Sequence, residues 1–138
     1  AFGSGPRKDS LRNIEATGEF AVNLVSHELR EQMNATSATV ARSVDEFALA
    51  GVPKAECTTI PCPRVADAPA TLECRVLHML TLLGDNNTLV VGEVTGIHLR
   101  DDCLVDGRFD VTRFHPVGRL GYRDYVVVKD LVQMTRPG

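Results

Sequence analysis

The opening stretch of this sequence gathers residues that suit the binding of a phosphate group. Residues 3–10 read GSGPRKDS, a small and flexible loop that leads into the expected start of a helix. Arg7 and Lys8 supply positive charge, and Ser10 adds a hydroxyl. Asp9 is a suitable N-cap, and the free N–H groups and dipole of the helix start meet these side chains. This pattern predicts a phosphate cradle, although solvated loops of the same composition are also common.

Two further places carry residue types that could assist chemistry. Arg119 lies between Gly118 and Gly121, with Tyr122 directly after the second glycine, so a guanidinium and an aromatic ring come close together. The alternative is an ordinary turn with Arg119 in solvent. His98 follows two glycines on an expected strand, where an imidazole at the mouth of a substrate site could bind a ligand or move a proton. The alternative for His98 is a structural histidine held by hydrogen bonds.

Composition and spacing argue against several other classes of protein. The net charge is −3 and the hydrophobic fraction is 43%, which indicates a folded domain rather than a nucleic-acid binder with a basic surface. No apolar run approaches the ~20 residues that span a bilayer, so no membrane contact is expected. The cysteines form no C-x-x-C pair and the histidines show no metal spacing, so no metal site is predicted. We expect a cytoplasmic protein with reduced cysteines.

Helix signals occur mainly in the first half of the chain. Asp9 and Gly18 bound a short amphipathic helix, because glycine readily adopts the left-handed conformation that ends helices. A strand with alternating apolar residues follows at residues 20–24. We expect two more helices. One comprises residues 27–35 and is capped by Ser26. The other is a short helix that begins with a capping box of Ser43 and Glu46 and ends at Gly51.

The clearest strand signal is a long hairpin in the second half of the chain. Residues 71–82 and 88–99 are the two expected strands, and residues 84–87 (GDNN) favour the turn between them. Gly92 and Gly96 indicate a bulge or a close approach of the backbone. On the first strand, one face is expected to carry Leu72, Cys74, Val76, His78, Leu80 and Leu82, with Glu73 on the other face. Apolar residues on both faces predict a barrel wall whose second surface is buried in a partner.

Several motifs in sequence order resemble one known family. Residues 7–14 (RKDSLRNI) and 17–24 (TGEFAVNL) are similar to the R-K-D-T-x-x-N-I and T-G-E-F-V-V-N-L signature of the flavin reductase-like, FMN-binding split-barrel family. Ser10 stands where threonine is usual, which keeps the hydroxyl. Further pieces follow in the order of the family: MNATS at 33–37, DEF at 45–47, AG at 50–51, PRV at 63–65, LEC at 72–74, GEV at 92–94 and PVGRLG at 116–121.

The resemblance implies a mainly β fold, an antiparallel Greek-key split barrel with a few short helices. It assigns residues 1–138 to one such domain, which we expect to lack its N-terminal strands because the chain opens on the loop into the first helix. It also implies a homodimer, in agreement with the two-sided apolar hairpin.

An FMN-dependent oxidoreductase is the function that the resemblance implies. NADH or NADPH would give a hydride to the flavin, and electrons would pass to free flavin, a monooxygenase component or another acceptor. A flavin-binding electron carrier or sensor without NAD(P)H turnover is the alternative. A third possibility is a barrel that kept only the scaffold, because a fold does not determine a function.

The same resemblance gives the opening loop a role at the cofactor. Arg7, Lys8, Asp9 and Ser10 would lie at the FMN phosphate. Lys8 would supply charge and Ser10 a hydroxyl, whereas Asp9 would cap the helix rather than touch the phosphate.

Two other segments would lie near the flavin ring. Asn34, Ala35 and Thr36 would form a loop on the flavin side or the dimer side, or would only end a helix. Arg119 and Tyr122 would lie beside the isoalloxazine, where a cation and an aromatic ring stack on it and stabilise a reduced, anionic flavin.

Overall fold

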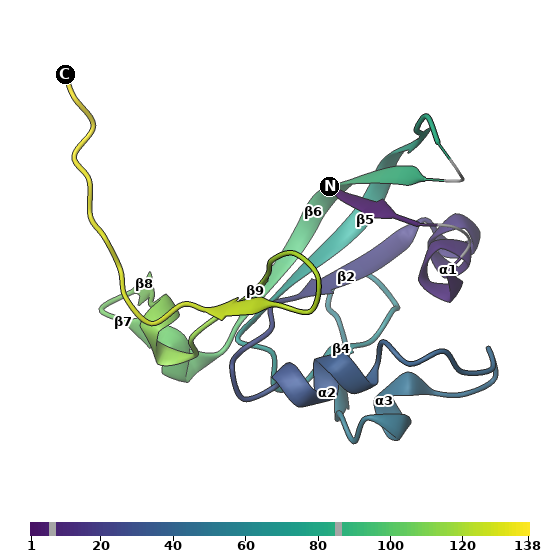
Figure 1. Cartoon of the computed structure of the whole chain (residues 1–138), viewed down its shortest axis with the longest axis horizontal. Coiled ribbons are helices and arrows are strands. Elements are labelled where there is room, and N and C mark those ends of the chain that lie inside the picture. Colours follow the sequence, from purple (N-terminus) through teal and green to yellow (C-terminus); the bar gives the residue numbers. More distant parts are fainter. Residues whose placement is uncertain (6–7, 85–86) are drawn as a thin grey trace.

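A four-stranded antiparallel sheet forms the body of the protein, whose structure is a computed structural model that describes residues 1–5, 8–84 and 87–138. The strands lie in the order β1, β6, β5, β2 (Figure 1). Their bounds are Phe2–Ser4 for β1, Thr88–Leu99 for β6, Ala70–Thr81 for β5 and Glu19–Asn23 for β2. All neighbouring pairs are antiparallel, so the predicted mainly β fold and its long hairpin, β5 with β6, are confirmed.

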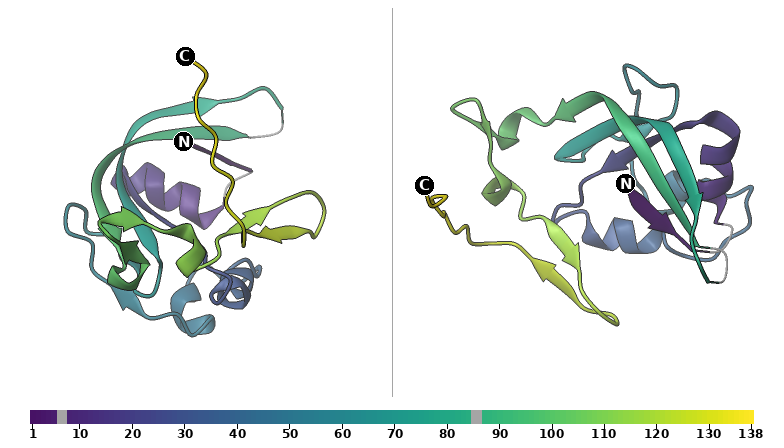
Figure 2. Two further views of the ribbon diagram at one scale, coloured as in Figure 1. Left: turned by 90° about the vertical axis from the view of Figure 1, so that its left-hand side faces the viewer. Right: turned by 90° about the horizontal axis from the view of Figure 1, so that it is seen from above.

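Helix α1 (Asp9–Thr17) fills the inside of the curl that the sheet makes, as Figure 2 shows. Leu11 and Ile14 point from the helix into the core and pack with Val90 of β6. Burying these three side chains fixes the helix against the sheet. The helix ends at Gly18, as predicted, where a φ of 71° turns the chain and the Gly18 N–H donates to the Ile14 carbonyl at 2.8 Å.

Two irregularities in the hairpin change which side chains face the core. The register shifts between Glu73 and Cys74 and again between Val76 and His78, where Leu77 is the extra residue on β5. Val76 and Met79 therefore both pack against the core cluster, which strict alternation would forbid. The predicted single face is thus wrong beyond Val76, because His78 is exposed there.

The two glycines of β6 let other side chains approach its backbone closely, as predicted. A Cβ on Gly92 would lie 2.6 Å from Cζ of Phe20, which is too close for any side chain. A Cβ on Gly96 would lie 3.0 Å from Oε2 of Glu73. Gly92 therefore makes room for an aromatic ring of the core, and Gly96 makes room for a carboxylate.

Helix α2 (Arg30–Ala35) begins three residues later than predicted. Ser26 is fully buried and forms an isolated antiparallel bridge with Pro116. Its hydroxyl accepts the Leu29 N–H at 3.2 Å, so residues 26–29 form a turn that leads into the helix. Ser26 thus pairs with a residue that is 90 positions away in the sequence. This distant pairing outweighs the local sequence preference for a helix at residues 27–29.

The predicted capping box at Ser43 is wrong. Asp45 is the N-cap of α3 (Glu46–Leu49), because its carboxylate accepts the Phe47 N–H at 3.1 Å. The helix still ends near Gly51, whose φ is 64°.

Short elements complete the chain. They are β3 (Lys54–Ala55), β4 (Arg64–Val65), the 3₁₀ turn η1 (Asp101–Cys103), β7 (Leu104–Val105), β8 (Arg108–Phe109), the 3₁₀ turn η2 (Val111–Arg113), β9 (Val117–Arg119) and β10 (Tyr125–Val127). The pairs β3–β4, β7–β8 and β9–β10 are small antiparallel hairpins. Across the described part of the chain, every helix is too short or too polar to cross a bilayer.

Candidate functional site

The predicted phosphate cradle lies where the chain leaves the sheet and enters α1. Ser4 pairs with Thr88, so the loop starts beside the hairpin end of β6. Lys8 is the N-cap, with extended backbone angles, and its carbonyl accepts the Arg12 N–H at 3.2 Å. Lys8 and Ser10 are both exposed. A cation, a hydroxyl and the first-turn N–H groups thus all occur at the start of one nine-residue helix.

The position of Asp9 differs from the prediction by one residue. Asp9 is the first residue of α1 rather than its N-cap. Its carboxylate lies 3.8 Å from the Arg12 guanidinium, which partly balances a negative charge next to the cradle. Arg7 lies outside the described residues.

A hollow of about 530 Å³ lies between α2 and the β9–β10 hairpin. Three predicted site residues line it together, namely Asn34, Arg119 and Tyr122. The other lining residues are Arg30, Glu31, Met33, Ser37, Arg123 and Tyr125. Three guanidinium groups and one carboxylate give the hollow a positive lining, which suits an anionic or electron-rich ligand.

Arg119 is held in place by its own hairpin. Its two terminal nitrogens donate to the Tyr125 hydroxyl at 3.0 Å and to the Tyr122 carbonyl at 2.7 Å. The guanidinium carbon lies 5.1 Å from the centre of the Tyr125 ring. Tyr122 has a positive φ of 55° and a 94% exposed side chain. The hairpin therefore holds the Arg119 cation beside the Tyr125 ring, while Tyr122 reaches into solvent.

Ala35 and Thr36 close the end of α2, with Thr36 as its C-cap. The Thr36 hydroxyl donates to the Met33 carbonyl at 2.8 Å. Thr36 lines a second hollow of about 280 Å³, which is more apolar and includes Phe47 and Val52. Asn34 and Thr36 therefore contact two different hollows, and Met33 borders both.

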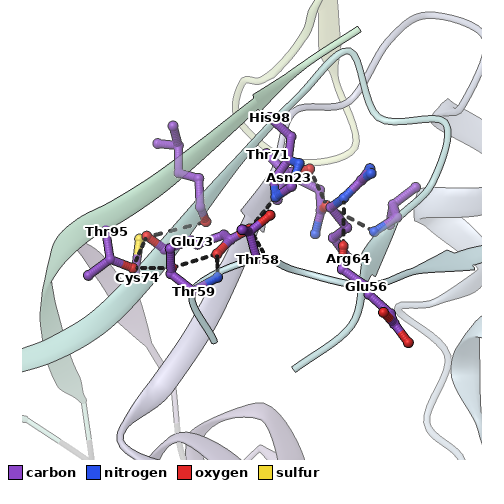
Figure 3. Close-up of polar contacts among 12 residues, drawn as sticks. Asn23, Glu56, Thr58, Thr59, Arg64, Thr71, Glu73, Cys74, Thr95 and His98 are labelled. Atoms are coloured by element: carbon purple, nitrogen blue, oxygen red, sulfur yellow. Dashed lines mark hydrogen bonds and ion pairs between the residues drawn. The ribbon is translucent and has the colours of Figure 1, made fainter. Parts of the chain in front are cut away.

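His98 belongs to a polar network around a buried carboxylate (Figure 3). Glu73 of β5 is fully buried, and its Oε1 pairs with Nε2 of His98. The same carboxylate accepts the Thr58 N–H at 2.7 Å, the Thr59 N–H at 2.5 Å and the Thr59 hydroxyl at 2.5 Å. Thr95 extends the network through a 2.6 Å hydrogen bond to the Thr59 hydroxyl.

The donors around Glu73 keep it ionised. Burial on its own would raise the pKa of this carboxyl, because a charge is costly in a medium of low polarity. The donors from Thr59, Thr58 and His98 outweigh burial and lower the pKa to about 2. Glu73 is therefore a carboxylate throughout the physiological pH range.

The network lies far along the sheet from the phosphate cradle. His98 is ten residues from Thr88 on β6, a path of about 30 Å along the strand at the usual rise. The structure therefore does not bring His98 together with Lys8 and Ser10.

Glu73 and its loop donors are the part of the site that the sequence pattern did not predict. Glu73 was expected on the face opposite Cys74, with no role assigned to it, and both residues are buried. The feature of the sequence that could have indicated this network is a lone carboxylate in a largely apolar strand. It lies opposite Gly96 in the hairpin. Among the described residues, no three histidine, cysteine or acidic side chains come together in a way that could hold a metal.

Comparison with known proteins identifies the family and the fold of this chain. Residues 1–115 match the family described as the flavin reductase like domain. A protein of Deinococcus radiodurans is 35% identical over 145 residues, which cover 99% of this chain and 63% of that protein. The chain spans about two thirds or less of the length of that relative and of two others.

Two solved structures share the fold. The 2-nitrobenzoate 2-nitroreductase of Pseudomonas fluorescens superposes with a TM-score of 0.83 at 30% identity, covering 94% of this chain and 64% of that one. A protein of Shewanella frigidimarina that is described as having a split barrel domain superposes with a TM-score of 0.86 at 22% identity, covering 98% of this chain and 70% of that one. The curled sheet is therefore that of a split barrel, as predicted.

We expect the buried carboxylate of Glu73 to make unfolding depend on pH. Its pKa is lowered in the folded protein, so the stability that it adds is complete above pH 4.5 and is lost as the pH falls toward 2. Glu73→Gln should lower the free energy of unfolding at pH 7 by about 1–3 kcal/mol and flatten this acid dependence. Urea denaturation over a series of pH values measures both effects.

Glu93→Gln is the matched control, since Glu93 is an exposed residue on the adjacent strand. It should change the free energy of unfolding by less than about 0.5 kcal/mol. Equal stability of the Glu73→Gln protein and the wild type at pH 7 would contradict the role given to the network.

Proposed function

Since the chain belongs to the flavin reductase like family, we propose that it binds FMN and acts as an FMN-dependent oxidoreductase with NADH or NADPH as the electron donor. The observation that carries the proposal is the family match over residues 1–115. The structural neighbour at 30% identity is itself named as a nitroreductase, which supports a reductive activity. Free flavin, a monooxygenase component or another small molecule is the proposed acceptor.

The residues at the start of α1 fit the phosphate of FMN in their chemistry. A phosphate is a dianion with three strong acceptor oxygens, and Lys8, Ser10 and the first-turn N–H groups offer a cation and several donors. Arg7 would add a second cation. Asp9 would remain a helix residue paired with Arg12 and would not contact the phosphate.

The hollow beside α2 fits a flat ring with electron-rich oxygens. Its volume of about 530 Å³ is within the usual range for small-molecule sites. Arg119 and Tyr122 would lie beside the isoalloxazine, and Asn34 would contact it from α2. Ala35 and Thr36 would shape the end of that helix.

Bound FMN would supply the electron-transfer chemistry, and the side chains would set where it occurs. Arg119 is already oriented by two hydrogen bonds, so it can favour negative charge in the ring without first becoming ordered. His98 pairs with Glu73 and lines neither hollow, so for this residue we propose the structural role of a histidine held by hydrogen bonds.

The proposed function predicts a yellow protein whose colour responds to a nicotinamide. Under anaerobic conditions, NADH or NADPH should bleach the flavin absorbance near ~450 nm, because the bound flavin accepts two electrons. Dithionite serves as the control that shows the flavin to be reducible. Bleaching by dithionite alone would indicate an electron carrier or sensor, and a colourless protein that does not take up FMN would indicate a barrel without flavin.

We further propose a homodimer that covers the apolar outer face of the hairpin. Leu77 is 55% exposed and Ile97 is 62% exposed, although both lie on the central strands of the sheet. Light scattering at micromolar concentration should give twice the chain mass, and Ile97→Asp should shift the protein toward the monomer. Val132→Asp, at an exposed residue after β10, is the control that should leave the mass unchanged. A monomeric wild-type protein would refute the proposal.

The phosphate cradle is tested by comparing two ligands. Lys8→Ala should weaken FMN binding by about 1–3 kcal/mol, the usual value for losing a hydrogen bond to a charged group. The same change should leave riboflavin binding almost unaltered, because riboflavin has no phosphate. Fluorescence titration of the apoprotein with both ligands gives the two dissociation constants.

Lys129→Ala, in the exposed segment after β10, is the matched control for the loss of one positive charge. Equal losses for FMN and riboflavin in Lys8→Ala would mean that Lys8 acts through folding or through the ring. Unchanged binding of both ligands would place the phosphate elsewhere.

A further inference from the structure

The turn between β9 and β10 holds a tyrosine in a backbone conformation that favours glycine. The Asp124 N–H donates to the Gly121 carbonyl at 3.0 Å, so Tyr122 and Arg123 are the two central residues of a β-turn. Tyr122 has a φ of 55°, which strains the backbone of a residue with a bulky side chain, whereas glycine adopts such angles freely. Strained residues of this kind gather at binding and catalytic sites.

The side chain of Tyr122 lies at the edge of the hollow beside α2. It is 94% exposed, so packing within the described part of the chain does not offset the strain of its backbone. It nevertheless lines the hollow, as does Tyr125. An exposed aromatic ring offers a flat apolar surface on which a second ring can stack. A ligand that stacks there would give this strained tyrosine a function.

The three arginines that line this hollow differ in what already holds them. Arg119 donates to two acceptors of its own hairpin. Arg30 lies 3.3 Å from the Glu31 carboxylate. Arg123 is exposed, and its guanidinium forms no ion pair or hydrogen bond with residues 1–5, 8–84 or 87–138. Arg123 is therefore the cation of the hollow that remains available to a ligand.

A guanidinium next to an exposed aromatic ring suits a flat ligand with a negative group. Guanidinium and carboxylate match each other through two parallel N–H···O hydrogen bonds. Arg119 faces the isoalloxazine in the proposed function, and Arg30 is paired with Glu31, so one positive charge remains for a further ligand. One charge fits a carboxylate better than a doubly charged phosphate. The ligand class that these residues favour is therefore an aromatic carboxylate.

We propose that Tyr122 and Arg123 form a subsite for an aromatic carboxylate, with the aromatic ring on Tyr122 and the carboxylate on the Arg123 guanidinium. The inference rests on the proposed function for the role of this ligand, which is that of the small-molecule electron acceptor beside the flavin. The carboxylate only holds the ligand and takes no electrons. Binding requires the hollow alone, so it is measured without turnover.

Titration of the FMN-saturated protein with benzoate and with benzamide tests the proposal. The two probes have nearly the same shape, but only benzoate is charged at neutral pH. We expect benzoate to bind about 10-fold more tightly or better, because it adds charge-assisted hydrogen bonds. In NMR spectra of isotope-labelled protein, the amide signals of residues 121–124 should shift as benzoate is added.

The same titration of protein without FMN separates failure of the subsite from failure of the proposed function. A protein that does not take up FMN but still prefers benzoate would refute the flavin proposal and support the subsite. A protein that binds FMN and shows equal binding of benzoate and benzamide, or no binding of either, would overturn the subsite alone. These results are read on the unsubstituted chain, so they do not depend on the folding of a variant.

Variants of the cation test which group selects the charge. Arg123→Gln should weaken benzoate binding about 10-fold and leave benzamide binding unchanged. Arg136→Gln, at an exposed residue that does not line the hollow, is the matched control and should keep the preference for benzoate. An unchanged preference in Arg123→Gln would overturn the assignment. Phenyl phosphate that binds more than about 10-fold tighter than benzoate would also overturn it, in favour of a phosphate ligand.

Tyr122→Gly separates binding from stability. Glycine adopts the φ of this position without strain, so the Tm should stay the same or rise. Binding of both probes should weaken, because the stacking surface is lost. A tyrosine with only a structural role would give the opposite result, namely a lower Tm with unchanged binding, and that result would overturn the role of Tyr122.

Discussion

The buried carboxylate of Glu73 is the interaction on which much of the arrangement depends. It is a charge without solvent contact, and an uncompensated charge in such a place costs several kcal/mol. Four donors from two other segments satisfy it, namely the β3–β4 loop and His98 of β6. Those segments cannot move away without leaving the carboxylate unpaired. Gly96 completes the arrangement, since a side chain there would press on the carboxylate.

This constraint acts at one end of the sheet, while the proposed cofactor contacts lie elsewhere. The phosphate cradle depends on the position of α1, which is set by the packing of Leu11 and Ile14 against Val90. The hollow depends on α2 and the β9–β10 hairpin. The sheet connects these parts, because β6 runs from the cradle loop at Thr88 to the Glu73 network at His98. The central hairpin therefore links the three regions for which roles are proposed.

Local signals in the sequence predicted the elements whose causes are local. Gly18 ends α1 where expected, because a residue with left-handed backbone angles is needed there. The long hairpin was predicted from the alternating side chains of its two strands. The start of α2 was missed because Ser26 pairs with the distant Pro116. The predicted face of β5 was wrong beyond Val76. The cause is an extra residue, Leu77, that no local sequence pattern indicates. Similarly, the lone carboxylate of Glu73 in a strand does not predict which loop will donate hydrogen bonds to it.

The anionic cofactor proposed for this chain is compatible with its net charge of −3, because the charges are segregated. Arg30, Arg119 and Arg123 gather in one hollow with a single carboxylate, and Lys8 lies at the positive end of a helix dipole. Potential at a site is set by the charges nearest to it, since salt screens those farther than about 10 Å. Arg119 is oriented by two acceptors of the protein itself, so its contribution is present before any ligand arrives. A ligand with a negative group therefore meets a field that the fold has already built, although the protein as a whole is acidic.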